Sequence, residues 1–191
     1  MYYDTDSVPL RVVGIDQGTD KLGISVGEFT HGCKQLRIVD ATTIRSDILV
    51  SRYYQEFAAV HGDRLAKMHV IRRAVTRYLR AWSPVIVGSE GPYMARKTVT
   101  AYGSGMEILS ILRHALHDYD PYMPLHVIDP ARVKVAVGVD GRSKDKEDMR
   151  RAIRKHPLLT LELDIDTLGP DAVDAIAVQT YFYRHLVLGE P

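Results

Sequence analysis

Residues 12–26 read VVGIDQGTDKLGISV, an apolar run that ends in an aspartate, turns through glycines and returns as a second apolar run. The run before Asp16 is typical of a strand buried on both faces. An ionised carboxylate at the end of such a strand is unfavourable unless an arginine, a hydrogen-bond network or a cation compensates it. The stretch therefore predicts two consecutive strands and a specific partner for Asp16.

The rest of the chain alternates strand and helix patterns. The glycine-containing joints between the first three strands predict an antiparallel meander, and the later alternation predicts helices on both faces of the sheet. In the helices, Leu65 and Met106 are expected on the buried stripes, and Asp63 is expected to be an N-cap. The predicted strands are 10–17, 23–29, 36–44, 85–90 and 125–130, and the predicted helices are 63–82, 98–117, 144–155 and 170–185; residues 45–62 are assigned to loop with some helix, and 131–140 are left open.

Bulk composition fits one globular domain. The chain has 191 residues, of which 46% are hydrophobic and 26% charged. No apolar run approaches the roughly 20 residues of a membrane span, and the acidic, polar first residues are not a secretory signal. A single cysteine, Cys33, excludes an internal disulfide and a cysteine-rich zinc site. We expect a cytoplasmic protein with a flexible tail at 1–9 and one domain at 10–191.

Charge is segregated along the chain although the net charge is only +1. Residues 131–155 contain nine Lys or Arg and four acids, whereas residues 156–174 contain five acids and no Lys or Arg. Such segments are either solvated helix faces or a phosphate-binding surface beside a cation site. Composition leaves both interpretations open.

Four carboxylates are candidates for a site. Asp16 and Glu90 end apolar strands, and Asp171 and Asp174 lie three residues apart on one face of the last helix. Each alone is as well explained by a turn residue or by a helix N-terminus that favours negative charge. If the four converge, cations must offset their repulsion, and carboxylate oxygens favour Mg²⁺ or Mn²⁺. Two such ions about 4 Å apart support phosphodiester hydrolysis.

Four segments together carry a family resemblance. They are GIDQGTDKLGISV (14–26), VGSEGPYMARK (87–97), ARVKVAVGVDGRSKDKEDM (131–149) and PDAVDAIAV (170–178). In order and approximate spacing, the chain resembles the RuvC-type Holliday junction resolvases over roughly residues 10–180. The resemblance implies the RNase H-like fold of the retroviral integrase superfamily, with a mixed α/β sheet of five strands: three antiparallel strands first, then parallel strands.

The resemblance also implies roles for individual residues. Asp16, Glu90, Asp171 and Asp174 match the metal-binding catalytic acids, which implies two Mg²⁺ ions per site, with Mn²⁺ as a substitute. Lys144 matches an active-site lysine. The expected DNA contacts are Tyr93, an aromatic that stacks at the junction, together with Arg96, Lys97, Lys134, Arg142 and Lys146.

The implied activity is that of a structure-selective, Mg²⁺-dependent endonuclease. It would resolve four-way junctions in DNA recombination and repair through paired symmetric nicks by a homodimer. Three features depart from the family pattern: Gln17 replaces the usual proline, segment 45–62 is longer, and Asp140 and Asp145 interrupt the basic loop. These departures suit a divergent, phage-encoded relative acting in the host cytoplasm, as well as a bacterial one.

Other functions fit parts of the pattern. GIDQGT also resembles the phosphate loop of actin/Hsp70-like nucleotide-binding proteins, but those need two such domains and a second glycine-rich motif. A nuclease of the same fold acting on RNA or on other branched DNA, and a non-catalytic DNA-binding module, remain alternatives. His114 and His117 have helical spacing for a metal pair, yet no third ligand is near them in the sequence, so a solvated pair is the simpler interpretation.

Overall fold

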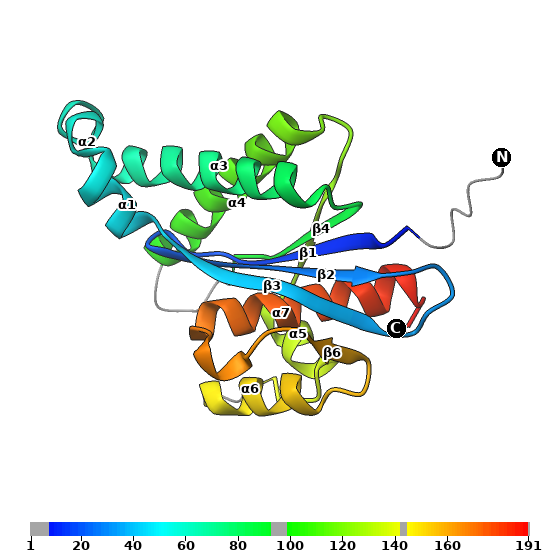
Figure 1. Ribbon diagram of the computed structural model, residues 1–191. Helices are drawn as coiled ribbons and strands as arrows, with labels where there is room; N and C mark the ends of the chain where they lie inside the picture. Colours follow the sequence, from blue (N-terminus) through cyan, green and yellow to red (C-terminus); the bar gives the residue numbers. More distant parts are fainter. Residues whose placement is uncertain (1–7, 93–98, 142–144, 191) are drawn as a thin grey trace, which may run out of the picture.

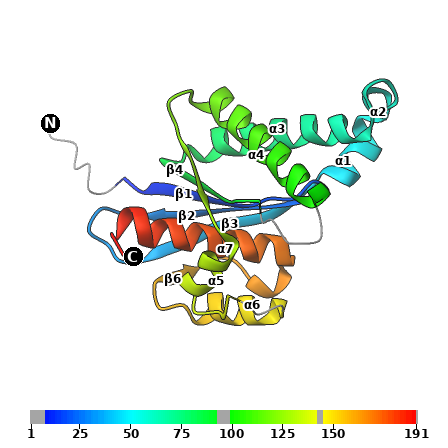
Figure 2. The ribbon, with the colours of Figure 1, turned by 180° about the vertical axis from the view of Figure 1, so that it is seen from behind.

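The computed structural model describes residues 8–92, 99–141 and 145–190. One mixed sheet lies between two layers of helices (Figure 1, and from behind Figure 2). Within the described ranges, no helix combines the length and apolarity needed to cross a bilayer. The elements are β1 (Leu10–Asp16), β2 (Lys21–Phe29), β3 (Leu36–Arg45), α1 (Ser46–Tyr53), α2 (Gln55–His61), α3 (Asp63–Trp82), β4 (Ile86–Glu90), α4 (Val99–Tyr119), β5 (Leu125–Ile128), α5 (Pro130–Ala136), α6 (Lys146–Lys155), β6 (Leu159–Leu161), the 3₁₀ turn η2 (Ile165–Thr167), α7 (Pro170–Phe182) and the π-helical turn η3 (Tyr183–Val187).

The strand order is β5-β4-β1-β2-β3-β6. The pairs β1/β2 and β2/β3 are antiparallel, whereas β1/β4, β4/β5 and β3/β6 are parallel. The predicted mixed sheet, with its antiparallel meander first, is confirmed. The predicted number of five strands is wrong: β6 adds a sixth at the edge. With three residues, β6 is too short for its alternation to be visible in the sequence.

Two apolar cores lie on opposite faces of the sheet. On one face, α3 and α4 pack over Val13 and Ile15, and on the other α5, α6 and α7 pack near Val12. In Figure 1, α3 and α4 lie above the sheet and α7 runs beneath it. Because side chains alternate along a strand, β1 supplies both cores from successive residues. This explains why the run before Asp16 is apolar at every position.

Helix α7 lies unusually close to the sheet because glycines in three strands leave room for its backbone. A Cβ atom on Gly14 would overlap the Ala175 carbonyl oxygen, and one on Gly23 would overlap that of Asp171. A Cβ on Gly88 would overlap the Phe182 ring. These glycines thus fix where α7 sits over β1, β2 and β4, and with it where the aspartates of α7 lie.

Several local predictions need correction. Residues 45–62 form α1 and α2 rather than mostly loop, and 131–140 contain α5. Leu65 and Met106 are 51% and 41% exposed, so neither belongs to a buried stripe; their neighbours Ala66 and Ile108 are buried instead, so the buried face of each helix is turned away from the two predicted residues. Asp63 is the first residue of α3 and not its N-cap, which is Gly62; it instead pairs with Lys67, Oδ2 to Nζ, at 2.6 Å.

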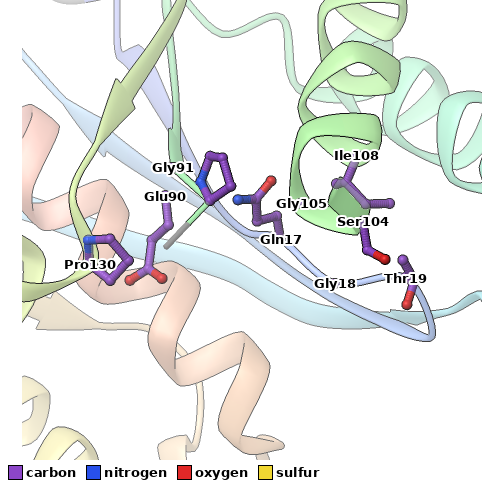
Figure 3. A pocket seen from close by; sticks show the side chains of 10 residues that line it. Gln17, Gly18, Thr19, Glu90, Gly91, Ser104, Gly105, Ile108 and Pro130 are labelled. Atoms are coloured by element: carbon purple, nitrogen blue, oxygen red, sulfur yellow. The ribbon is translucent and has the colours of Figure 1, made fainter. Parts of the chain in front are cut away.

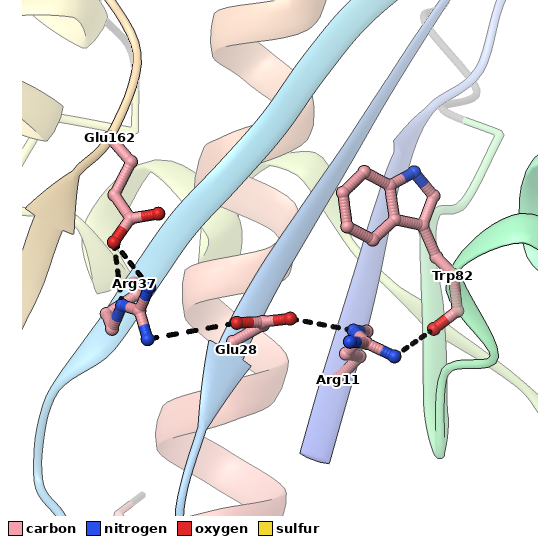
Figure 4. Close-up of polar contacts among 5 residues, drawn as sticks. All are labelled: Arg11, Glu28, Arg37, Trp82 and Glu162. Carbon is pink, nitrogen blue, oxygen red and sulfur yellow. Dashed lines mark hydrogen bonds and ion pairs between the residues drawn. The ribbon is translucent and has the colours of Figure 1, made fainter. Parts of the chain in front are cut away.

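A chain of alternating charges crosses the sheet where β1 begins (Figure 4). Arg11 Nε donates to Glu28 Oε1 at 2.9 Å and its Nη1 donates to the Trp82 carbonyl oxygen at 2.9 Å. Glu28 is also 3.9 Å from Arg37, whose Nε donates to Glu162 at 2.8 Å. Each charge therefore has an opposite charge beside it, and side chains link β1, β2 and β3 to the residue directly after β6.

Candidate active site

Asp16 and Glu90 end neighbouring parallel strands. In the β1/β4 ladder, Ile15 lies opposite Ser89. Each strand has one residue more, so Asp16 and Glu90 stand at the same edge of the sheet. The Gly91 N–H donates to the Ile128 carbonyl oxygen at 2.7 Å, which ties the end of β4 to β5. The fold therefore brings Asp16 and Glu90, the two acids predicted at strand ends, side by side.

Both carboxylates are on the sheet face that α7 covers. Side chains two residues apart share a face, so Asp16 faces the same way as Gly14 and Glu90 the same way as Gly88. Those two glycines lie directly against α7. Figure 3 shows the Glu90 side chain leaving the end of β4 with its carboxylate directed toward that helix.

The first turns of α7 bring two more acids to this edge. Pro170 occupies the first turn of α7, as predicted. Gly23 is the ladder partner of Asp16 and lies against the backbone of Asp171. Asp171 and Asp174 are half-buried, whereas the residues between and after them are buried. The predicted convergence of the four backbone positions is thus present in the fold.

The pKa of Glu90 reflects how these charges interact. Burial, then the negative charge of Asp174, raises the pKa of Glu90 to about 7, with a smaller upward contribution from Asp129 and an opposing one from Lys134. A raised pKa means that the ionised form of the carboxyl group is destabilised relative to its protonated form. Strong perturbation of a carboxylate pKa by burial and a like charge is typical of functional sites.

Lys134, predicted as a DNA contact, lies in α5 near enough to Glu90 to lower its pKa. Two further residues at this edge were not predicted. Asp129 caps α5, accepting the Ala131 N–H at 2.8 Å, and adds negative charge near Glu90. Arg45, at the end of β3, pairs with Asp47 and is also attracted by Asp171. Arg45 directly follows the predicted strand 36–44, and Asp129 lies near the end of the predicted strand 125–130, which was the available signal.

The side chains do not form a finished metal shell. Among the described residues, no three His, Cys, Asp or Glu side chains are arranged so as to hold a metal ion. Mutual repulsion of four carboxylates opposes such an arrangement unless a cation is between them. The donor set itself, oxygen only and anionic, fits a hard cation such as Mg²⁺ or Mn²⁺.

Most of the predicted DNA contacts lie outside the described residues. They are Tyr93, Arg96, Lys97, Arg142 and Lys144; Lys146 begins α6, and its side chain is outside the description as well. One acid of the basic loop has a local structural role. Asp145 is the N-cap of α6 and accepts the Glu147 N–H at 2.9 Å. Its presence among cations is therefore explained by helix capping.

Comparisons with known proteins agree with this architecture. No protein-family model matches the chain. A protein from Thermomicrobium roseum named crossover junction endodeoxyribonuclease RuvC is 27% identical over 176 residues, covering 92% of this chain and 94% of the relative. A protein of the same name from Chloroflexus aurantiacus is 27% identical over 173 residues, covering 88% and 90%.

Solved structures give the same fold. The T. thermophilus RuvC in complex with Holliday junction substrate has a TM-score of 0.70 at 20% identity, covering 94% of this chain and 96% of that one. The yeast mitochondrial Holliday junction resolvase Ydc2 has a TM-score of 0.62 at 14% identity, covering 94% and 81%. The fold is therefore RNase H-like, as predicted. With the curated relatives matched over nearly their full length, the resemblance to the RuvC-type resolvases is confirmed.

Proposed function

We propose that this protein is a structure-selective endodeoxyribonuclease that resolves Holliday junctions and related branched DNA. The observation that carries the proposal is that the backbone positions of Asp16, Glu90, Asp171 and Asp174 lie at one sheet edge, with the pKa of Glu90 raised to about 7 by burial and by Asp174. The names of the relatives, crossover junction endodeoxyribonuclease and Holliday junction resolvase, support the substrate.

Divalent cations complete the proposed site. Asp16, Glu90, Asp171 and Asp174 would hold them, most simply as two Mg²⁺ ions, with Mn²⁺ able to substitute. When bound, such ions supply an activated water and charge stabilisation for in-line phosphodiester hydrolysis. The chain's own contribution is to fix the backbone positions that carry these carboxylates on β1, β4 and α7.

Lysine and arginine side chains of the protein would bind the DNA. Lys134 in α5 is the described example: it is half-buried and lies near enough to Glu90 to lower the pKa of that carboxyl, so a phosphate bound at the site edge would be within its reach. We keep the predicted contacts of Tyr93, Arg96, Lys97, Arg142, Lys144 and Lys146 as part of this proposal. Lys144 would stabilise developing charge at the scissile phosphate, and the others would bind backbone or, for Tyr93, stack on a base.

Two symmetric cuts require two sites. A four-way junction has approximate two-fold symmetry, so a homodimer with an isologous interface supplies matched sites. We expect α4 to form much of the interface, and its exposed Met106 is consistent with this. Light scattering of the pure protein, with and without a junction, tests the assembly. A protein that stays monomeric with DNA yet nicks both strands symmetrically contradicts the dimer.

In this proposal residues 10–191 act as one nuclease domain. Junction resolution also places the protein with cellular DNA, in the bacterial cytoplasm or in the host cytoplasm for a phage-encoded protein. Both statements rest on the proposed activity.

A substrate panel tests the function. Four-way, flap, bubble and RNA/DNA hybrid substrates are incubated with the protein and Mg²⁺, and with Asp16→Asn as the inactive control. We expect paired nicks in the four-way junction, slower cleavage of other branched DNA and none by the control. Preferred cleavage of the hybrid would instead establish an RNA-directed nuclease. Binding of ATP by calorimetry without cleavage of any substrate would establish the actin/Hsp70-like alternative.

A further inference from the structure

Helix α3 has a strongly basic exposed face that the proposed active site does not use. Its second half contains Arg72, Arg73, Arg77 and Arg80, all exposed, and no acid. The one acid of the helix is Asp63, its first residue. Arg73, Arg77 and Arg80 are spaced by four and then three residues, which puts their side chains on one helix face. We call these three residues the arginine stripe.

The positive charge of the arginine stripe is largely uncompensated by the part of the chain that the structure describes. Asp118 of α4 pairs with Arg72, accepting from its Nε at 2.6 Å and from its Nη2 at 2.7 Å. Arg80 donates to the backbone carbonyl oxygen of Asp118 at 2.9 Å. Arg73 and Arg77 form neither a hydrogen bond nor an ion pair with any described residue. Of these four arginines, Arg72 alone therefore has an ion pair within the described ranges.

The positive field on this face acts on a neighbouring side chain. His69 lies on α3 one turn before Arg73 and contacts the rings of Tyr54 and Phe57. Burial, then the charges of Arg73 and Arg72, lowers the pKa of His69. Like charges four residues apart also oppose helix stability. Stability therefore does not explain why arginines gather on this face, whereas an anionic partner does.

Helix α3 begins at the same sheet edge as the proposed active site. Lys67 Nζ lies 3.0 Å from Oδ1 of Asp20, in the turn that follows Asp16. At about 1.5 Å per residue, the arginine stripe lies about 9–20 Å further along the helix axis than Lys67. One turn of B-DNA is longer, at about 34 Å. In Figure 1, α3 belongs to the outer layer on one face of the sheet, and α1 and α2 lie beside its first turns. The arginine stripe is therefore exposed and within reach of DNA held at the site.

The inference rests on the proposed function. We propose that the arginine stripe binds the phosphate backbone of one duplex arm of the branched substrate while another part of the junction is held at the carboxylates. The carboxylates lie on the α7 face of the sheet, whereas α3 covers the opposite face. The arms of a junction leave the branch point in different directions, so one arm can lie along α3. Arginine suits this role because its guanidinium keeps its charge and its fork of N–H donors matches phosphate oxygens.

The salt dependence of junction binding tests the inference. Affinity for a four-way junction is measured over a range of salt concentrations, with Ca²⁺ in place of Mg²⁺. Wild type is compared with Arg73→Gln, Arg77→Gln and Arg77→Lys, and with the control Lys34→Gln. Lys34 is exposed and lies between β2 and β3, at the end of the sheet where β1 begins.

Each glutamine variant of the arginine stripe should bind the junction about three- to tenfold more weakly near about 0.1 M salt. Each should also reduce the slope of log affinity against log salt concentration by about 1, since one phosphate contact is lost. Arg77→Lys keeps the charge and should keep most of the slope. Lys34→Gln should match wild type although it removes the same charge. Melting temperatures should be unchanged, because glutamine and arginine have similar helix propensities.

Cleavage separates the arginine stripe from the active site. With protein in excess, the single-turnover rate in Mg²⁺ should match wild type for all of these variants. Unchanged affinity and slope in both glutamine variants would overturn the inference while junction cleavage stands. An equal loss in Lys34→Gln, or an Arg77→Lys variant that binds no better than Arg77→Gln, would also overturn it, because net charge or side-chain packing would then be the cause. If wild type neither binds nor cleaves any junction, the proposed function fails and this inference with it.

Discussion

Charged side chains are arranged differently at the two ends of strand β1. Where β1 begins, Arg11, Glu28, Arg37 and Glu162 alternate in sign across β1, β2, β3 and the residue that follows β6 (Figure 4). Where β1 ends, Asp16 stands beside Glu90, and the negative charge of Asp174 raises the pKa of Glu90. Lys134 and Arg45 also lie at this end: Lys134 opposes the rise in the pKa of Glu90, and Arg45 is attracted by Asp171.

This difference in charge arrangement distinguishes side chains that stabilise the fold from side chains that serve the proposed function. Alternating charges satisfy one another and hold the sheet together. Converging carboxylates oppose folding in the absence of a cation, so their presence is explained by what they bind. Changes at the two ends should therefore have opposite consequences: loss of activity without loss of stability at one end, and the reverse at the other.

The largest effect is expected at the carboxylate end. Asp16→Asn, Glu90→Gln and Asp174→Asn should each lower the junction cleavage rate more than about hundredfold, since changing even an indirect metal partner costs 10- to 100-fold. Asp171→Asn should be equally or somewhat less severe. Single-turnover assays in Mg²⁺ measure the rate. Junction affinity should be kept or increased, because negative charge near phosphates is removed.

Glu90→Gln should also keep or raise the melting temperature of the metal-free protein, because burial and Asp174 destabilise the ionised Glu90 carboxylate. A variant among the first three with near wild-type cleavage would remove its residue from the site. One that melts many degrees lower would show that its carboxylate has a structural partner, and the contrast between the two ends would be lost.

The second effect is a pH dependence set by Glu90. Its pKa is about 7 in the folded protein and 4.5 in its ordinary state, so the folded state retains a proton that the unfolded state has lost. The stabilising contribution is complete below pH 4.5 and is lost as pH rises through about 7. Relative to Glu90→Gln, the metal-free wild type should therefore become steadily less stable across this window.

Thermal melts of both proteins between pH 4.5 and 8 measure this difference. Adding Mg²⁺ at pH 8 should raise the melting temperature of wild type more than that of Glu90→Gln, because a bound cation compensates the ionised carboxylate. Parallel pH curves for the two proteins would show that Glu90 titrates normally.

The third effect, on stability, is expected where β1 begins, among the paired charges. The Glu28 side chain is 13% exposed and lies between two arginines, so Glu28→Gln should reduce the free energy of unfolding by about 1–3 kcal/mol. Urea denaturation measures the change. Cleavage well below the melting temperature should match wild type, which makes this substitution the counterpart of Glu90→Gln. A large loss of cleavage by the folded variant would show that the two ends are coupled.

The smallest effect concerns Arg37 and Glu162, whose side chains are 51% and 42% exposed. A double-mutant cycle of Arg37→Ala and Glu162→Ala should give a coupling free energy of about 0.2–1 kcal/mol that decreases with added salt. A coupling as large as that of Arg11 with Glu28 would show that exposure does not decide the strength of pairs at this end.

Much of the fold could be predicted from the sequence because its signals are local. The strands β1 to β5 and the helices α3, α4, α6 and α7 have strong apolar periodicity or clear breakers, and each was predicted within a few residues. The segment 45–62 has no such periodicity. Its second helix, α2, has no buried residues, so no apolar stripe marks it in the sequence. For β6, pairing with β3 decides a conformation that three residues cannot specify alone.

The sequence by itself determined which residues are available for chemistry. The acids Asp16 and Glu90 follow apolar strands and the aspartates Asp171 and Asp174 share a helix face, and these facts need no coordinates. What only the tertiary structure decided is their environment: strand register sets Asp16 beside Glu90, glycines let α7 approach, and burial raises the pKa of Glu90. Such effects depend on distances between segments far apart in the chain, which the sequence alone does not specify.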